Sequence, residues 1–233
     1  MKFELCAASI EAIQIAKQYD FDRIELCQSL EQGGLTPSYG MIEYAQAYGI
    51  ETHVLIRPRP GGFVYSRDEV EIILREIISC KRIGVKGVVL GVLKETGEID
   101  KELLKEMMDK AEGMDVTFHR AFDDSIEWKP SLEILISLGV KRVLSSGLAT
   151  NIENGMPVLK QMVNFADAKI EIMAGGGVNA ANISRLVEDV KPNAVHFSGT
   201  SKFELDEDSF FSESILKVDP KKVQRILDVA RVM

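Results

Sequence analysis

The feature that most constrains the fold is an eightfold alternation of short strand patterns with helix patterns along the 233-residue chain. The strand patterns cover residues 2–6, 23–27, 51–57, 87–91, 115–120, 141–146, 169–175 and 193–199. The helix patterns cover residues 9–19, 38–48, 67–84, 100–113, 129–139, 152–166, 179–190 and 220–233. Strands that alternate with helices pair in parallel, so eight such units predict a closed (β/α)8 barrel of the TIM type. An open doubly wound sheet has the same period and is the alternative.

The predicted helices carry recognisable end signals. Ser66 and Glu69 have the spacing of a capping box, in which each side chain bonds the other residue's backbone N–H. Asp219 followed by Pro220 is a typical start for the last helix. Glycines follow three of the helix patterns and predict left-handed helix ends: Gly49, Gly84 and Gly139.

The chain is expected to form one domain over residues 1–233, because no Pro- or Ser-rich linker interrupts the pattern. Its one unusual segment is the acidic stretch 202–217, before the last helix. We expect this segment to be irregular, as either a lid or a solvated insertion. The sequence does not distinguish these two roles.

Composition limits the partners and the compartment. A net charge of −8 argues against nucleic acid or an anionic membrane as the main partner. The apolar runs are much shorter than the ~20 residues that a membrane-spanning helix needs. Three cysteines in no disulfide pattern, together with no recognisable export signal, predict a cytoplasmic protein.

Alternation along each strand predicts which side chains face the barrel interior. Ile24 and Leu26 are expected to face the helices, so Arg23, Glu25 and Cys27 point the other way. The same rule sends the following polar residues inward: Glu4, Cys6, His53, Arg57, Thr117, His119, Glu171 and His196. A structural barrel interior consists mostly of branched aliphatic residues. The three histidines and three carboxylates therefore predict a site near the C-terminal mouth of the barrel.

Within that site, Glu4, Glu25 and His119 are the candidate acid–base residues. The two glutamates end up on neighbouring strands, and two close carboxylates tend to share a proton. A shared proton suits proton transfer in concert with His119.

The loops above the mouth offer groups for an anionic ligand. Arg57, Arg59 and Arg120 present planar forks that match a carboxylate or phosphate, although each arginine has glutamates as alternative partners. Glycine-rich turns after the last strands often hold phosphate through backbone N–H groups, but they also serve tight turns. The turns after strands six to eight contribute Ser146, Gly175, Gly176, Gly177, His196 and Ser198 as candidate ligand-binding residues.

Cys6 and Cys27 end neighbouring strands with the same parity, so their sulfur atoms approach each other if the strand register aligns them. Two thiolates with few hard ligands suit a soft ion such as Cu(I). Without further ligands, these residues alone favour two buried, unreactive thiols over a metal site. Cys80, in the middle of a helix, is expected to serve packing.

Seven stretches in this order resemble the CutC family of copper-homeostasis proteins: "DRIELCQSLEQGGLTPSYG", "IRPRPGGFVYS", "GVVLGVL", "VTFHRAFD", "RVLSSG", "IMAGGGV" and "VHFSG". The resemblance implies a TIM-type barrel, a cytoplasmic location and a homo-oligomer, with a dimer favoured. It also implies Cu(I) binding with Cys6 and Cys27 as ligands. The stretch "RPRPGGF" departs from relatives that tend to read "RPRGGDF", and the resemblance ends near Ser198.

Two functions follow from these observations. The first is a copper-homeostasis protein that binds Cu(I) at the barrel mouth through the two cysteines. The second is a lyase, isomerase or hydrolase that acts on a small phosphorylated or carboxylated metabolite. In that case the arginines and glycine turns hold the anion, and His119 transfers protons with Glu25 or Glu4.

Overall fold

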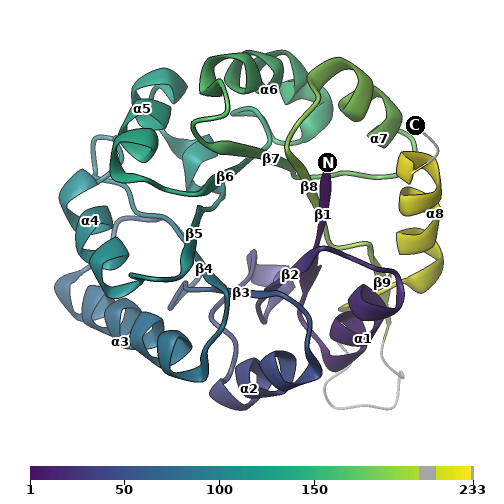
Figure 1. Cartoon of the computed structure of the whole chain (residues 1–233), viewed down its shortest axis with the longest axis horizontal. Helices are drawn as coiled ribbons and strands as arrows, with labels where there is room; N and C mark the ends of the chain where they lie inside the picture. Colours follow the sequence, from purple (N-terminus) through teal and green to yellow (C-terminus); the bar gives the residue numbers. More distant parts are fainter. Residues whose placement is uncertain (205–213, 232–233) are drawn as a thin grey trace.

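The computed structural model describes residues 1–204 and 214–231, and its eight parallel strands close into a barrel (Figure 1). Each strand pairs with the next along the chain, and β8 pairs with β1. The strands are β1 (Lys2–Ala7), β2 (Arg23–Leu26), β3 (Thr52–Leu55), β4 (Gly87–Leu90), β5 (Asp115–Phe118), β6 (Arg142–Ser145), β7 (Glu171–Gly175) and β8 (Ala194–Phe197). The predicted closed barrel is confirmed, and the open doubly wound sheet is excluded.

Helices surround the barrel as an outer ring (Figure 1). They are α1 (Ile10–Gln18), α2 (Tyr39–Tyr48), α3 (Arg67–Ile83), α4 (Lys101–Lys110), α5 (Trp128–Leu138), α6 (Ile152–Ala166), α7 (Ile183–Arg185) and α8 (Pro220–Arg231). Two short 3-10 turns lie after strands, η1 (Leu30–Gln32) and η2 (Arg120–Asp124), and one π-helical turn, η3 (Leu186–Val190), follows α7. Within the described residues, no helix is long and apolar enough to cross a membrane.

The predicted helix ends are confirmed. Ser66 and Glu69 form both hydrogen bonds of the capping box at the start of α3. The carboxylate of Asp219 accepts hydrogen bonds from the backbone N–H groups of Lys221 and Lys222 at the start of α8. The three predicted glycines end α2, α3 and α5 with φ angles between 76° and 84°: Gly49, Gly84 and Gly139.

Two predicted segments differ from the structure. The helix expected over 179–190 is reduced to α7 and η3, because Asn179 and Asn182 bond nearby backbone N–H groups in a turn that precedes the helix. The segment expected to be irregular over 202–217 contains parts of an antiparallel pair, β9 (Thr200–Phe203) and β10 (Ile215–Val218). Residues 205–213, between these strands, lie outside the described part of the chain.

The apolar core lies mainly between the strands and the helices. Every barrel strand contributes a fully buried residue to it: Leu5, Ile24, Val54, Val88, Phe118, Val143, Ile172 and Val195. Among the described residues, the barrel interior contains two small apolar clusters, one around Cys6 and Leu55 and one around Leu144 and Met173. The predicted inward and outward faces of the strands are therefore confirmed, and polar side chains fill much of the interior.

One group of interior polar residues lies at the N-terminal ends of the strands, and we call it the closed-end network. Arg142 donates hydrogen bonds of 3.1 Å to Glu171, Asp115 and Thr117, and its Nη1 atom lies 3.1 Å from His53 Nδ1. The prediction that His53 and Glu171 lie near the mouth is therefore wrong. Glu171 is the first residue of β7 and His53 is the second of β3, so both side chains fall at the opposite end of the barrel.

Candidate functional site

A cavity of about 380 Å³ opens at the C-terminal ends of the strands, where TIM barrels carry their active sites. We call it the mouth cavity. Its lining consists of Cys6, Glu25, Leu30, Gly33, Leu55, Arg57, Phe63, His119, Arg120, Asp123, Asp124, Leu144 and His196. The structure thus brings together residues that the sequence placed on β1, β2 and β8 and at the ends of β3 and β5.

Four side chains at the base of this cavity form what we call the Cys6 cluster: Cys6, Glu25, Cys27 and His196. The Sγ atom of Cys6 lies 3.7 Å from Cys27 Sγ and 3.7 Å from Glu25 Oε1. Ligand atoms of Cys6, Glu25 and His196 all lie within 4.8 Å of one another. The expected approach of the two sulfur atoms is confirmed, and a carboxylate and an imidazole join them.

Glu4 lies beneath the Cys6 cluster and is fully buried. It accepts hydrogen bonds from Arg23 Nε and from His196 Nδ1, the latter at 2.7 Å. Burial alone raises the pKa of Glu4, but the hydrogen bond from His196 and the charges of His196 and Arg23 lower it well below its usual range. Glu4 is therefore a fixed anion that positions His196, and it does not line either cavity at the mouth.

His196 is held as a cation. Burial favours its neutral form, but the charge of Glu25 and the hydrogen bonds with Cys6 and Glu4 raise its pKa well above the usual value. The charged ring lies between the carboxylates of Glu4 and Glu25, and its positive charge stabilises their ionised forms.

Glu25 differs from Glu4 because it has no arginine partner. Burial raises its pKa to about 6, and its Oε2 atom has no hydrogen-bond partner within the described residues. The two glutamates were expected to share a proton, but the structure gives them different partners and opposite pKa shifts. Glu25 alone has a pKa suited to proton transfer near neutral pH.

The raised pKa of Glu25 predicts a pH dependence of stability. The folded protein holds this proton up to about pH 6, whereas the unfolded chain loses it near 4.5. The favourable contribution is complete below pH 4.5 and is lost as the pH rises through 6, which costs about 2 kcal/mol. Glu25→Gln should remove this loss. The free energy of unfolding, measured in urea from pH 4 to 8, should therefore favour the variant increasingly over that range; parallel curves would contradict the assignment.

His119 is a neutral imidazole whose tautomer can be inferred from its contacts. Burial lowers its pKa to about 3, with a further contribution from the charge of Arg57. Its Nδ1 atom accepts a 3.1 Å hydrogen bond from the backbone N–H of Ala121, so the proton lies on Nε2. That Nε2 atom is buried and has no partner within the described residues.

The three rim arginines have different roles. Arg57 donates to the carbonyl oxygens of Gln32, Gly34 and Gly61 at 2.8–3.0 Å, and its Nε atom has no partner within the described chain. Arg57 therefore lines the mouth cavity while it holds two loops together.

Arg59 does not line either mouth cavity, and its expected role in ligand binding stays a prediction. Its guanidinium pairs with Glu69 and donates to the carbonyl oxygens of Gly62 and Val64 at 2.8 Å. The capping residue Glu69 lies in the first turn of α3 and draws Arg59 away from the mouth.

Arg120 is the most available of the three arginines. It donates to Asp123 and to Ser146 Oγ, both at 2.8 Å, and remains partly exposed. Asp123, which the sequence analysis missed, also accepts from the N–H of Ser146 and of Leu148. Ser146 itself lines neither cavity at the mouth and serves to hold Arg120 and Asp123. The three-residue spacing of Arg120 and Asp123 was a usable signal.

A second hollow of about 410 Å³ adjoins the mouth cavity and shares Cys6, Arg120 and His196 with it. We call it the glycine pocket. The rest of its lining is Gly176, Gly177, Val178, Asn179, Phe197, Ser198, Gly199, Thr200 and Lys222. Gly175 does not line it; a Cβ atom there would lie 2.7 Å from Leu144, so this glycine serves packing.

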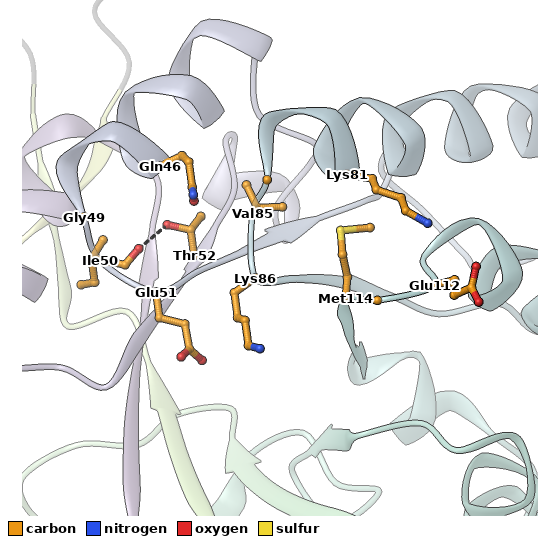
Figure 2. A pocket seen from close by; sticks show the side chains of 12 residues that line it. Gln46, Gly49, Ile50, Glu51, Thr52, Lys81, Val85, Lys86, Glu112 and Met114 are labelled. Atoms are coloured by element: carbon orange, nitrogen blue, oxygen red, sulfur yellow. Dashed lines mark hydrogen bonds between the residues drawn. The ribbon is translucent and has the colours of Figure 1, made fainter.

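A larger cavity, of about 630 Å³, lies at the other end of the barrel near the starts of β3, β4 and β5. Figure 2 shows its charged side chains spread along the opening rather than directed at one point: Glu51, Lys81, Lys86 and Glu112. All four are exposed, and the drawn hydrogen bond joins Thr52 to the carbonyl of Ile50. Buried titratable groups with shifted pKa values mark functional sites more reliably, so the mouth is the better candidate.

Fold and site define a single-domain (β/α)8 barrel protein with a buried polar site at its C-terminal mouth. The family model described as the CutC family matches residues 1–201, and the chain belongs to that family. A "family protein CutC" from Glaesserella parasuis serovar 5 is 40% identical over 231 residues, which covers 99% of this chain and 94% of the relative.

Solved structures agree with this family. A candidate copper homeostasis protein CutC from Streptococcus agalactiae is 34% identical and covers 84% of this chain and 98% of its own, with a TM-score of 0.80. Phosphoribosyl anthranilate isomerase from Thermotoga maritima covers all of both chains with a TM-score of 0.62. At 12% identity, this second likeness shows the fold alone.

Proposed function

We propose that this protein takes part in copper homeostasis by binding Cu(I) as cargo through Cys6 and Cys27. The observation that carries the proposal is the 3.7 Å separation of two buried sulfur atoms at the mouth of the barrel. Membership of the CutC family and the copper-homeostasis name of the Streptococcus agalactiae relative support it. The proposal includes a cytoplasmic location, where thiols stay reduced, and a homodimer.

The donor set suits a soft monovalent ion. Two sulfur atoms and the imidazole of His196 are soft or borderline ligands, and among the described residues Glu25 is the one hard ligand in this group. The hydrogen bond with Cys27 and burial raise the pKa of Cys6 well above its usual value. A metal must therefore displace the thiol protons, and also the imidazolium proton where it binds His196, so copper affinity should increase with pH.

An anaerobic titration with Cu(I) against a competing chelator tests this function. The wild-type protein should bind about one Cu(I) per chain, and the Cys6→Ser/Cys27→Ser variant should bind none, because a soft ion needs both thiolates. Cys80→Ser is the matched control, since Cys80 is the third cysteine and is buried in α3, away from the mouth. Copper binding that persists in the double variant would overturn the proposal.

The glycine pocket favours a second function, catalysis on a small phosphorylated or carboxylated metabolite. Gly176, Gly177 and Ser198 place backbone next to Arg120 and Lys222, which is an arrangement suited to an anion. Glu25, with its pKa of about 6, lies in the adjoining mouth cavity. Arg120, Lys222 and the glycine turns have no role in copper binding, so variants of these residues test the second function separately.

A further inference from the structure

Unpaired polar atoms are concentrated in the mouth cavity. Within the described chain, five buried side-chain nitrogen or oxygen atoms have no hydrogen-bond partner. Three of them belong to residues that line this one cavity: Glu25 Oε2, Arg57 Nε and His119 Nε2. A buried polar atom without a partner is costly, so such atoms in a native protein call for an explanation.

The three atoms have defined hydrogen-bonding capacities. Arg57 Nε is always a donor, and His119 Nε2 is a donor because Nδ1 accepts from Ala121. Both side chains contact the ring of Phe63, whose centroid lies 5.3 Å from Arg57 Cζ and 4.8 Å from the His119 centroid. Both donors belong to residues that line the mouth cavity beside Phe63, and they suit an acceptor such as a carbonyl or carboxylate oxygen.

Glu25 offers the complementary capacity. A hydroxyl group on the ligand can both donate and accept a hydrogen bond. It can therefore bond Glu25 Oε2 whether the carboxyl group of Glu25 is ionised or protonated. A ligand with only acceptor oxygens, such as sulfate, would satisfy the two donors but would leave an ionised Glu25 unpaired. A ligand with a hydroxyl beside a carbonyl group satisfies all three atoms.

Arg120 is available at the boundary with the glycine pocket. Its Nε and Nη2 atoms bond Asp123 and Ser146, and a Cβ atom at position 176 would lie 3.3 Å from Nη1. Because Gly176 has no side chain, the outer edge of the guanidinium stays uncovered. Arg120 and the glycine pocket thus accept an anionic group at the other end of the ligand.

We propose that the mouth cavity binds a small hydroxycarbonyl compound with a terminal anionic group, and that Arg57 and His119 bind its carbonyl or carboxylate oxygen. The hydroxyl group bonds Glu25, and the anionic end lies against Arg120 and the glycine pocket. This inference rests on the second proposed function and specifies its substrate class. A carbonyl oxygen bonded by two buried N–H groups is polarised for proton transfer or bond cleavage at the adjacent carbon.

The three histidines make nuclear magnetic resonance of ¹⁵N-histidine-labelled protein a direct test. The probes are glycerate and 3-phosphoglycerate, compared with glycerol and glycerol 3-phosphate, which lack the carboxylate. The two carboxylates should shift the Nε2–H signal of His119 saturably, and the alcohols should not. 3-Phosphoglycerate should bind at least about tenfold more tightly than glycerol 3-phosphate, because a neutral hydroxyl oxygen is a weaker acceptor for the two donors than a charged carboxylate.

Variants of His119 show whether ligand affinity depends on the N–H donor of this side chain or on its shape. His119→Gln retains an N–H donor and should retain most of the affinity for 3-phosphoglycerate, whereas His119→Leu should lose about tenfold. Arg75→Gln, an exposed arginine on α3, is the control. Equal affinity for 3-phosphoglycerate and glycerol 3-phosphate would overturn this proposal and leave the second proposed function intact. Absence of binding by all four probes would overturn both this proposal and the second proposed function. The result of the copper titration would not depend on that outcome.

Discussion

Replacing Arg23 with methionine is expected to lower the free energy of unfolding by about 3–5 kcal/mol at pH 7, the usual effect of breaking a buried ion pair. Arg23 and Glu4 are both fully inaccessible to solvent, and the arginine Nε bonds the carboxylate directly. Methionine has a similar length but no charge. The variant would leave the Glu4 carboxylate with His196 as its one charged hydrogen-bond partner among the described residues. Urea unfolding at pH 7 measures the loss.

A second substitution shows whether the loss comes from the uncompensated charge. Arg23→Met/Glu4→Gln removes both charges, and the glutamine oxygen still accepts from His196, so stability should largely recover. Arg75→Met is the control, because Arg75 forms an exposed pair with Glu71 and should cost less than about 0.5 kcal/mol. A loss below about 1 kcal/mol for Arg23→Met would show that the barrel interior solvates Glu4 by other means.

Gly155→Ala is expected to destabilise the protein by about 3 kcal/mol, although alanine is the better helix former. Gly155 lies in the first turns of α6, which pack directly on the turn after β6. A Cβ atom at this position would lie 1.7 Å from the carbonyl oxygen of Ser146 and 3.0 Å from Gly147 Cα. Both are backbone atoms, so relief requires the helix or the turn to move.

Gly40→Ala is the matched control for this prediction. Gly40 lies at the start of α2, and a Cβ atom there would meet nothing within 4 Å. This substitution should be neutral or stabilise the protein by up to about 1 kcal/mol. Thermal and urea unfolding of both variants would measure the contrast, and equal effects would show that the turn after β6 adapts easily.

Much of the fold was predictable because its signals are local. The strand and helix periods, the Ser66 capping box and the glycines after three helices each depend on neighbouring residues. The helix expected over 179–190 was not predictable from its period, because Asn179 and Asn182 compete for the backbone N–H groups that would start it.

The sequence predicted which side chains face the barrel interior, but it did not predict their positions along the barrel axis. Alternation identified Glu25, His119 and His196 as inward-facing residues, and they meet at the mouth. The alternation rule gave no information on how the strands are staggered. This stagger places His53 in the closed-end network and not at the mouth. The partners of Arg23 were missed because they lie on other strands, and the role of Arg142 was missed altogether. For Arg23, the sequence pattern identified the inward direction only.

The closed-end network has a consequence for folding kinetics. Arg142, on β6, bonds side chains on β3, β5 and β7 that lie between 25 and 89 residues away in the sequence. Contacts over such separations form only after long stretches of chain have been ordered. Interactions that are absent from the transition state slow unfolding without accelerating folding. If these contacts form late, Arg142 is expected to lengthen the lifetime of each folded molecule and to have little influence on how fast that molecule forms.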